Sequence, residues 1–156
     1  MLCGSGNNGG DGYVLARLAR EAGLQVTVWK AAEPHPHSGA ACAAYEALRA
    51  TGIIPHSWSE NASLDAAEVI VDGLLGTGLD REVTGVYRTM IIAVNAARRP
   101  VLALDIPSGL HADTGQPLGV AVRAAATVSF IGLKQGLYTG QARDYVGAIS
   151  YSTLDV

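Results

Sequence analysis

The sequence predicts an α/β protein in which a doubly wound, mostly parallel sheet lies between two layers of helices. Strand-like and helix-like segments alternate along the 156 residues, and this alternation is typical of βαβ units. Residues 69–71 and 101–104 are apolar runs without polar alternation, as expected of strands covered on both faces. Residues 4–12 are rich in glycine and separate a short apolar stretch from an amphipathic pattern, as at a strand–turn–helix junction.

The first half of the chain carries signals for strands and helices in alternation. Apolar residues recur at helical spacing over residues 12–22, where Asp11 is the predicted N-cap and Gly23 the predicted stop. The other elements predicted here are strands at 1–3, 25–29 and 53–54, a helix at 38–50 after a Pro-His-Pro-His breaker at 34–37, and a loop at 57–63.

The second half continues the same pattern. Its predicted elements are strands at 68–72, 101–105, 126–131 and 147–151, and a helix at 86–98 that Arg99-Pro100 ends. No repeat or internal linker interrupts the pattern, so we expect one domain over residues 1–156.

Composition narrows the class of function. Hydrophobic residues make up 49% of the chain and charged residues 16%, with a net charge of −3 and no basic stripe, which argues against nucleic-acid binding. No apolar run approaches the length of a membrane span. The two cysteines have no metal-type spacing, so we expect reduced thiols in a cytoplasmic protein.

Five glycines among residues 4–12 indicate a conformational requirement rather than a packing one. We expect them to let the backbone present its N–H groups to an anionic, phosphorylated small molecule. Gly4, Gly6 and Gly9 also fit the G-x-G-x-x-G pattern of dinucleotide dehydrogenases. That class needs an acidic residue at the end of the second strand, where this chain has Trp29-Lys30.

Three polar segments each follow a predicted strand, at residues 7–11, 72–82 and 105–109. Because the carboxyl ends of parallel strands meet at one edge of a sheet, we expect these segments to form a common site. Asn8, Asp72 and Ser108 would supply oxygen atoms there, either to a weakly charged cation or to a hydrogen-bond network that ties the loops together. Spacing alone leaves both open.

Other candidates carry weaker signals. Residues 76–82 read either as a second backbone cradle, with Arg81 as a phosphate partner, or as a flexible surface loop. Lys134 follows the strand at 126–131 and would face the same edge, but a solvated lysine is the default expectation. We interpret none of the four histidines as a ligand or a base.

Four motifs together resemble the YjeF N-terminal domain, the NAD(P)HX epimerase. They are G-x-G-N-N-G-G-D-G at 4–12, V-D-x-L-L-G-T-G-L at 71–79, D-I-P-S-G-L at 105–110 and K-x-G-L at 134–137, in this order along nearly the whole chain. The resemblance implies a Rossmann-like fold and an isomerase that interconverts the R and S epimers of hydrated NADH and NADPH, with Asn8, Asp72 and Ser108 around a potassium ion. The residues that it implies for contact with the hydrated nucleotide are Asn7, Asn8, Gly9, Gly10, Asp11, Gly76, Thr77, Gly78, Leu79, Asp80, Arg81, Glu82 and Asp105.

Our hypothesis for the chemistry makes Asp105 the acid–base group, which protonates the departing hydroxyl and activates the returning water. The alternatives are a nucleotide-binding module without catalysis and, less favoured, an NAD(P)-dependent dehydrogenase. Members of the family usually carry a helical segment ahead of the first strand and are often fused to an NAD(P)HX dehydratase. The chain would thus lack this segment and be either a separate epimerase or the first part of a bifunctional protein. A dehydratase domain or protein is the expected partner, and a homodimer is one candidate assembly.

Overall fold

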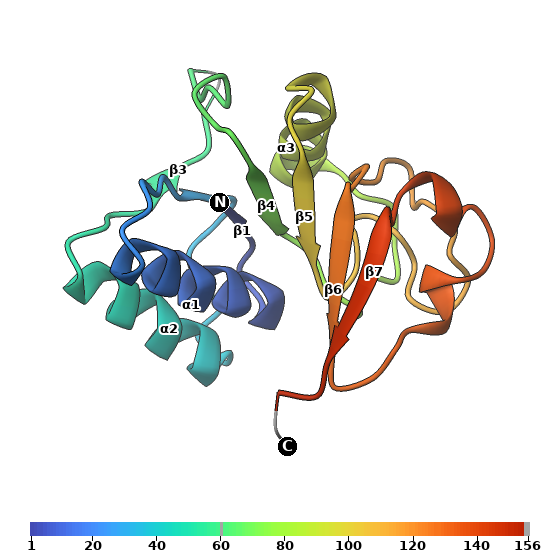
Figure 1. Cartoon of the computed structure of the whole chain (residues 1–156), viewed down its shortest axis with the longest axis horizontal. Coiled ribbons are helices and arrows are strands. Elements are labelled where there is room, and N and C mark those ends of the chain that lie inside the picture. Colours follow the sequence, from blue (N-terminus) through green and yellow to red (C-terminus); the bar gives the residue numbers. More distant parts are fainter. Residues whose placement is uncertain (60, 155–156) are drawn as a thin grey trace.

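A single seven-stranded sheet organises the molecule. The computed structural model describes residues 1–59 and 61–154, and within them every pair of neighbouring strands is parallel, in the order β3-β2-β1-β4-β5-β6-β7 (Figure 1). The strands are β1 (Leu2–Cys3), β2 (Trp29–Lys30), β3 (His56–Ser57), β4 (Ile70–Gly73), β5 (Val101–Leu104), β6 (Ala126–Phe130) and β7 (Ala148–Ser152). The helices are α1 (Asn7–Glu21), α2 (Gly39–Ala50) and α3 (Gly85–Ala96), with 3₁₀ turns η1 (Gln135–Leu137) and η2 (Ala142–Asp144).

The helices lie on both faces of the sheet, which confirms the predicted three-layer α/β class. Successive residues of a strand point to opposite faces. Leu2 accordingly belongs to the core cluster that contains Met90 and Val94 of α3, whereas Cys3 belongs to the cluster that contains Tyr13 of α1. Figure 1 shows α1 and α2 side by side, with α3 at a distance from both.

The strand order reverses between β1 and β4, the central pair of the sheet. Chain order runs outward from β1 through β2 to β3 on one side, and outward from β4 through β5 and β6 to β7 on the other. The loops that leave β1 and β4 therefore diverge and open a crevice at the carboxyl edge. This topology brings the glycine-rich segment beside residues 74–82.

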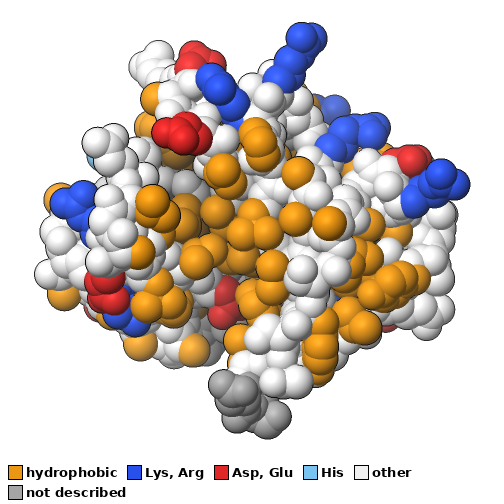
Figure 2. Space-filling view, in the orientation of Figure 1, with side chains coloured by type: hydrophobic (Ala, Val, Ile, Leu, Met, Phe, Trp, Pro, Cys, Tyr) orange, Lys and Arg blue, Asp and Glu red, His pale blue; other side chains and the backbone are white. Residues whose placement is uncertain are grey.

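On the side of β6 and β7, 3₁₀ turns and loops provide the cover. Ile106, Leu110, Leu137 and Val146 form a core cluster there with their neighbours. Along β6, Thr127 and Ser129 are buried, whereas Ala126, Val128 and Phe130 are only half-buried on the opposite face. Figure 2 shows hydrophobic side chains gathered over the strands beside α1. No helix of the described residues is both long and apolar enough to cross a membrane.

Most predicted boundaries lie within two residues of the observed ones, but the helix predicted over residues 12–22 begins five residues earlier. The N–H of Gly10 already donates to the carbonyl of Gly6 at 3.1 Å, so the helix starts at Asn7. The prediction of Asp11 as N-cap was wrong, because Asp11 lies within the helix and the cap position is Gly6. Gly23 does end the helix, with φ of +85°.

Two short strands were misplaced. The predicted strand at 25–29 forms pairs only at Trp29–Lys30, and the one at 53–54 lies instead at His56–Ser57. The register pairs only Leu2 with Trp29 and Cys3 with Lys30, so β2 is shorter than the apolar pattern suggests. Ser57, predicted as loop, is therefore in β3; residue 60 of that loop and residues 155–156 of the predicted domain lie outside the described residues.

Four of the five glycines at 4–12 serve close packing, contrary to our interpretation of the sequence; Gly6 is the exception. A Cβ on Gly4 would lie 1.8 Å from the carbonyl oxygen of Leu74, and one on Gly9 would lie 2.0 Å from that of Gly4. A Cβ on Gly12 would lie 2.7 Å from the sulfur of Cys3. The missing side chains thus allow α1 to press against β1 and the loop after β4, which fixes the helix N-terminus at the sheet edge.

We expect Gly9→Ala to lower the free energy of unfolding by more than about 2 kcal/mol. The steric clash between the new Cβ and the carbonyl oxygen of Gly4 should cost more than the gain of up to about 1 kcal/mol that alanine brings within a helix. Gly6→Ala is the matched control, since a Cβ there would meet no neighbouring atom within 4 Å and its φ of −95° suits alanine. Urea denaturation of both variants measures the difference. Equal stability of Gly9→Ala and the natural sequence would contradict the packing role.

Candidate functional site

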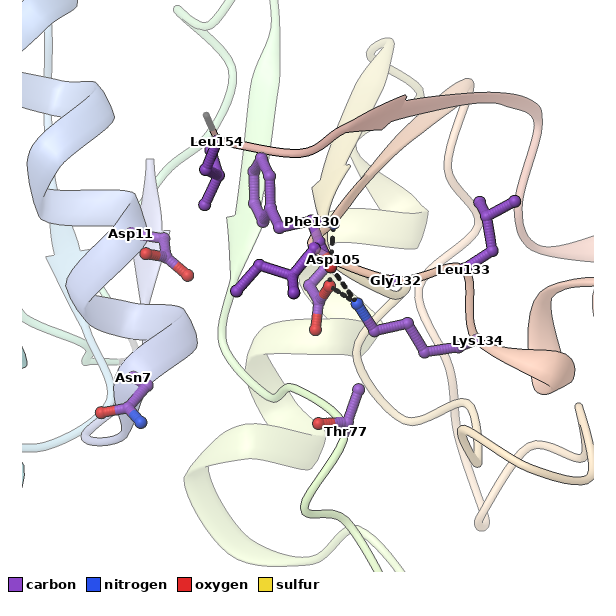
Figure 3. A pocket seen from close by; sticks show the side chains of 10 residues that line it. Asn7, Asp11, Thr77, Asp105, Phe130, Gly132, Leu133, Lys134 and Leu154 are labelled. Atoms are coloured by element: carbon purple, nitrogen blue, oxygen red, sulfur yellow. Dashed lines mark hydrogen bonds and ion pairs between the residues drawn. The ribbon is translucent and has the colours of Figure 1, made fainter. Parts of the chain in front are cut away.

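Two adjoining cavities, each of about 620 Å³, lie at the carboxyl edge between the two halves of the sheet. Asn7, Asp11, Thr77 and Asp105 line both. Figure 3 shows Asn7 and Asp11 on α1, with Asp105, Lys134 and Thr77 across the first cavity. This size is in the usual range for small-molecule sites, and the polar lining comes from segments that are distant in sequence.

The structure brings together most of the residues predicted to contact a nucleotide. Those that line a cavity are Asn7, Asn8, Asp11, Gly76, Thr77, Gly78, Leu79, Asp80, Arg81 and Asp105. Gly9 and Gly10 are buried within α1 and line neither cavity. Glu82 is exposed beside Gly119, also outside both cavities. The loop at 76–81 therefore faces the site rather than only solvent.

A fully buried carboxylate, Asp72, ties the loop after β5 to the end of β4. Its oxygens accept hydrogen bonds from the Ser108 hydroxyl at 2.6 Å, the Ser108 N–H at 2.8 Å and the Leu74 N–H at 3.2 Å. Burial raises the pKa of Asp72 to about 6, and the bonds from Ser108 and Leu74 oppose this rise. No cationic side chain is among these partners, so the site favours an added positive charge.

Asn8 joins the same group from the first turn of α1. Its Nδ2 donates to the carbonyl oxygen of Leu75 at 2.9 Å, while the N–H of Leu75 donates to the Ser108 hydroxyl at 2.8 Å. Asn8 is 8% exposed, and its Oδ1 is buried without a hydrogen-bond partner among the described residues. An unpaired buried oxygen is costly, so this atom is a candidate ligand for a cation.

Asp105 lies at the centre of a tight turn where β5 ends. The Ile106 N–H donates to the carbonyl oxygen of Leu104 at 2.8 Å, and Asp105 has φ of +66°, an uncommon conformation for a residue with a side chain. Ile131 repeats this turn at the end of β6, with φ of +64° and a bond from Gly132 to Phe130. Strain of about 1–3 kcal/mol per residue is typical of such positions and clusters at functional sites.

Lys134 forms an ion pair with Asp105, so the expectation of a solvated lysine was wrong. The side chains of both residues are only 17% exposed. The ammonium also donates to the carbonyl oxygen of Phe130 at 2.7 Å and to the Ser129 hydroxyl at 3.2 Å. The carboxylate accepts a further bond from the Phe130 N–H at 3.2 Å. These bonds hold Asp105 in one orientation.

Asp11 projects from the second turn of α1 into the space that Asp105 also lines. Partial desolvation raises the pKa of Asp11, although the side chain stays exposed to the cavity, and the negative charge of Asp105 raises it further. The cavity thus places two carboxyl groups in different settings, one paired with an ammonium and one beside a like charge. Such contrasts are typical of sites that move protons.

Sequence reasoning missed Tyr87 and the partner of Lys134. Tyr87 of α3 reaches the glycine-rich segment, where its hydroxyl lies 3.2 Å from both the nitrogen and the hydroxyl of Ser5. Both residues line the second cavity. Nothing in the spacing of α3 marked Tyr87. The position of Lys134 after a strand placed it at the carboxyl edge. Its pairing with Asp105, 29 residues away, left no signal in the sequence.

Comparisons with known proteins identify the family of the chain. A family model described as YjeF-related protein N-terminus matches residues 1–136. The chain is 50% identical over 149 residues to the bifunctional NAD(P)H-hydrate repair enzyme Nnr of Coxiella burnetii, covering 96% of this chain and 30% of that protein. It is 42% identical over 149 residues to an NAD(P)H-hydrate epimerase of Limosilactobacillus reuteri, covering 96% of this chain and 69% of that protein.

The fold has a solved counterpart as well. The crystal structure of yeast ynu0, YNL200c, matches with a TM-score of 0.79 and 19% identity, over 96% of this chain and 63% of that chain. At that identity the likeness establishes the fold alone. The chain spans about 30% of the length of the bifunctional relatives and 69% of the epimerase. From the match over residues 1–136 and the identity to these relatives, the chain belongs to the YjeF-related N-terminal family.

Proposed function

We propose that this chain interconverts the R and S epimers of hydrated NADH and NADPH. Family membership and the name of the relative from Limosilactobacillus reuteri support this function. The observation that carries it is an aspartate, Asp105, held by Lys134 in a strained turn at the edge of a cavity between the two halves of the sheet. Proton transfer to a departing hydroxyl and from an arriving water needs such a preorganised group.

The substrate explains why proton transfer suffices. In the hydrate, the carbon that bears the hydroxyl is bonded to the ring nitrogen, so the nitrogen lone pair can expel the hydroxyl as water. The product is an iminium ion, and water that adds to its other face inverts the centre. Expulsion needs a proton for the hydroxyl, and addition needs a base for the water. Neither step changes the oxidation state of the ring.

Asp105 is suited to move one of these protons. The hydrogen bonds that the described residues make to its carboxylate both fall on Oδ1, from Lys134 and Phe130. Oδ2 is therefore the oxygen that can meet the substrate. The ammonium of Lys134 orients the carboxylate and balances its charge before water arrives.

The second cavity suits the rest of the nucleotide. It runs from the N-terminus of α1 along residues 76–81, where Arg81 offers a cationic partner for a phosphate. The first N–H groups of α1 point out of the helix at this end, since the cap residue Gly6 has no side chain to bond them. A helix N-terminus of this kind favours anionic groups.

We also propose that potassium binds among Asn8, Asp72 and Ser108. The unpaired buried Oδ1 of Asn8 and the buried carboxylate of Asp72 fit a cation. No three His, Cys, Asp or Glu side chains gather as a metal site within the described residues, and a single carboxylate suits a monovalent ion better than a divalent one. A bound potassium ion would neutralise Asp72 and join three loops.

The S hydrate that the reaction forms would then be the substrate of a dehydratase. The relative from Coxiella burnetii is named a bifunctional repair enzyme, and this chain matches 30% of its length. A linked or separate dehydratase is accordingly the partner that we propose.

Chromatographic separation of the two epimers tests the function directly. Purified protein mixed with the R hydrate should produce the S hydrate faster than the spontaneous reaction, up to the same equilibrium ratio from either side. Binding of the hydrate without acceleration would instead establish a nucleotide-binding module. Hydride exchange with unmodified NAD in the same sample would establish a dehydrogenase.

Asp105→Asn should lower the rate of epimerisation by about 10²–10⁴-fold, because the amide cannot exchange the proton. Binding of the hydrate, measured by the shift in Tm that it causes, should remain. Asp113→Asn is the matched control, since Asp113 is exposed and lines neither cavity. Full activity of Asp105→Asn would remove Asp105 from the mechanism.

Potassium chloride should raise the Tm by a few degrees over tetramethylammonium chloride at equal concentration, since an ion that binds only the folded state stabilises it. The rise should be larger at pH 8 than at pH 5, because Asp72, with a pKa of about 6, must be ionised to hold the ion. Asn8→Ala should abolish the difference between the salts. Asn95→Ala, which also removes an amide bonded to the backbone, should preserve it. Equal Tm values in both salts would contradict the potassium site.

A further inference from the structure

Inversion at a carbon makes a demand that Asp105 alone does not meet. The hydroxyl leaves from one face of the ring, and water must add to the opposite face. Asp105 is fixed by its turn, by Lys134 and by the Phe130 N–H, so it reaches the ring from one side only. A second group that moves protons is therefore required across the cavity.

Asp11 occupies that position. It projects from α1, whereas Asp105 and Lys134 come from the ends of β5 and β6 on the other side of the cavity (Figure 3). Asp11 and Asp105 both line the two cavities, so a ring seated where these meet would have one carboxyl group near each face. Asn7 and Thr77, the other residues common to both cavities, do not titrate in the physiological range.

The two aspartates have different charged neighbours. Lys134 neutralises Asp105 through the ion pair, whereas the described hydrogen bonds and ion pairs give Asp11 no cationic partner. The other charged groups that line the cavities are Asp80 and Arg81, in the loop after β4. Asp11 is exposed on the cavity side, and its partial desolvation, together with the negative charge of Asp105, raises its pKa. One carboxylic acid and one carboxylate are what a departing hydroxyl and an arriving water need.

We infer that Asp11 is a second catalytic residue, which serves the ring face opposite to the one that Asp105 serves. This inference rests on the proposed epimerase function and adds that Asp11, on α1, and Asp105, at the end of β5, each transfer a proton on one face of the ring. It replaces the hypothesis that Asp105 handles both protons.

The proton and electron balance closes in each direction. When Asp11 acts as the acid, its proton passes to the hydroxyl, the carbon–oxygen bond breaks and the nitrogen lone pair forms the iminium double bond. Water then adds to the other face, its oxygen forms the new carbon–oxygen bond, and Asp105 takes the proton. The iminium electrons return to nitrogen. The reverse reaction exchanges the roles of the two residues, and solvent restores their protons between turnovers.

Oxygen exchange in H₂¹⁸O distinguishes proton transfer on one face of the ring from proton transfer on the other. Each epimer is incubated with enzyme, and chromatography with mass spectrometry then measures both inversion and ¹⁸O in the recovered substrate. Asp11→Asn should lose at least about 100-fold in inversion, yet still exchange the hydroxyl of the epimer that faces Asp105, above the spontaneous rate. Asp105→Asn should show the complementary pattern, with exchange confined to the other epimer.

Controls keep the outcome interpretable. Asp113→Asn should match the natural sequence in both readouts, and Asp11→Glu should recover part of the inversion because it retains the carboxyl group. A higher KM with unchanged kcat in Asp11→Asn would show that Asp11 only binds the substrate and would overturn the inference. So would exchange of the same epimer in both variants. Absence of inversion with the natural sequence would instead overturn the proposed function itself.

Discussion

The buried hydrogen bonds between Asp72 and Ser108 are the constraint on which the rest of the site depends. They join the end of β4 to the loop after β5, and through Leu75 they also engage Asn8 at the start of α1. A fully buried carboxylate is costly unless its hydrogen bonds are satisfied. Loss of one of these bonds should therefore destabilise the arrangement of all three segments. The second cavity lies against this anchor, since Asn8, Leu74 and Leu75 line it.

Close packing and strain then position the reacting groups. Glycines at the start of α1 bring the helix against β1 and the loop after β4, which places Asp11 over the edge of the sheet. On the other side, β5 and β6 each end in a tight turn of the same type, at Asp105 and at Ile131. The turn at Asp105 directs its carboxylate to Lys134. Rigid elements thus supply opposing walls. Asp11, Asp105 and Lys134 are far apart in the sequence, but the strand order of the parallel sheet brings them to one edge.

The sequence predicted the α/β class, most element boundaries and the convergence of Asn8, Asp72 and Ser108, because each follows from periodicity and from the common edge of parallel strands. It did not predict that α1 begins at Asn7, since glycine opposes helix formation locally and only the close approach to Leu74 and Gly4 explains the exception. Nor did it predict the positive φ of Asp105 or the pairing with Lys134. Both depend on where β5 and β6 end relative to each other, which local propensity does not encode.

A solved complex with hydrated NADPH and potassium would test the proposed mechanism most directly. We expect the hydroxyl-bearing carbon of the ring between Asp11 and Asp105, with the phosphates along residues 76–81 and the ion at Asn8, Asp72 and Ser108. A ring bound away from the carboxyl edge, or one with both aspartates on the same face, would contradict this mechanism.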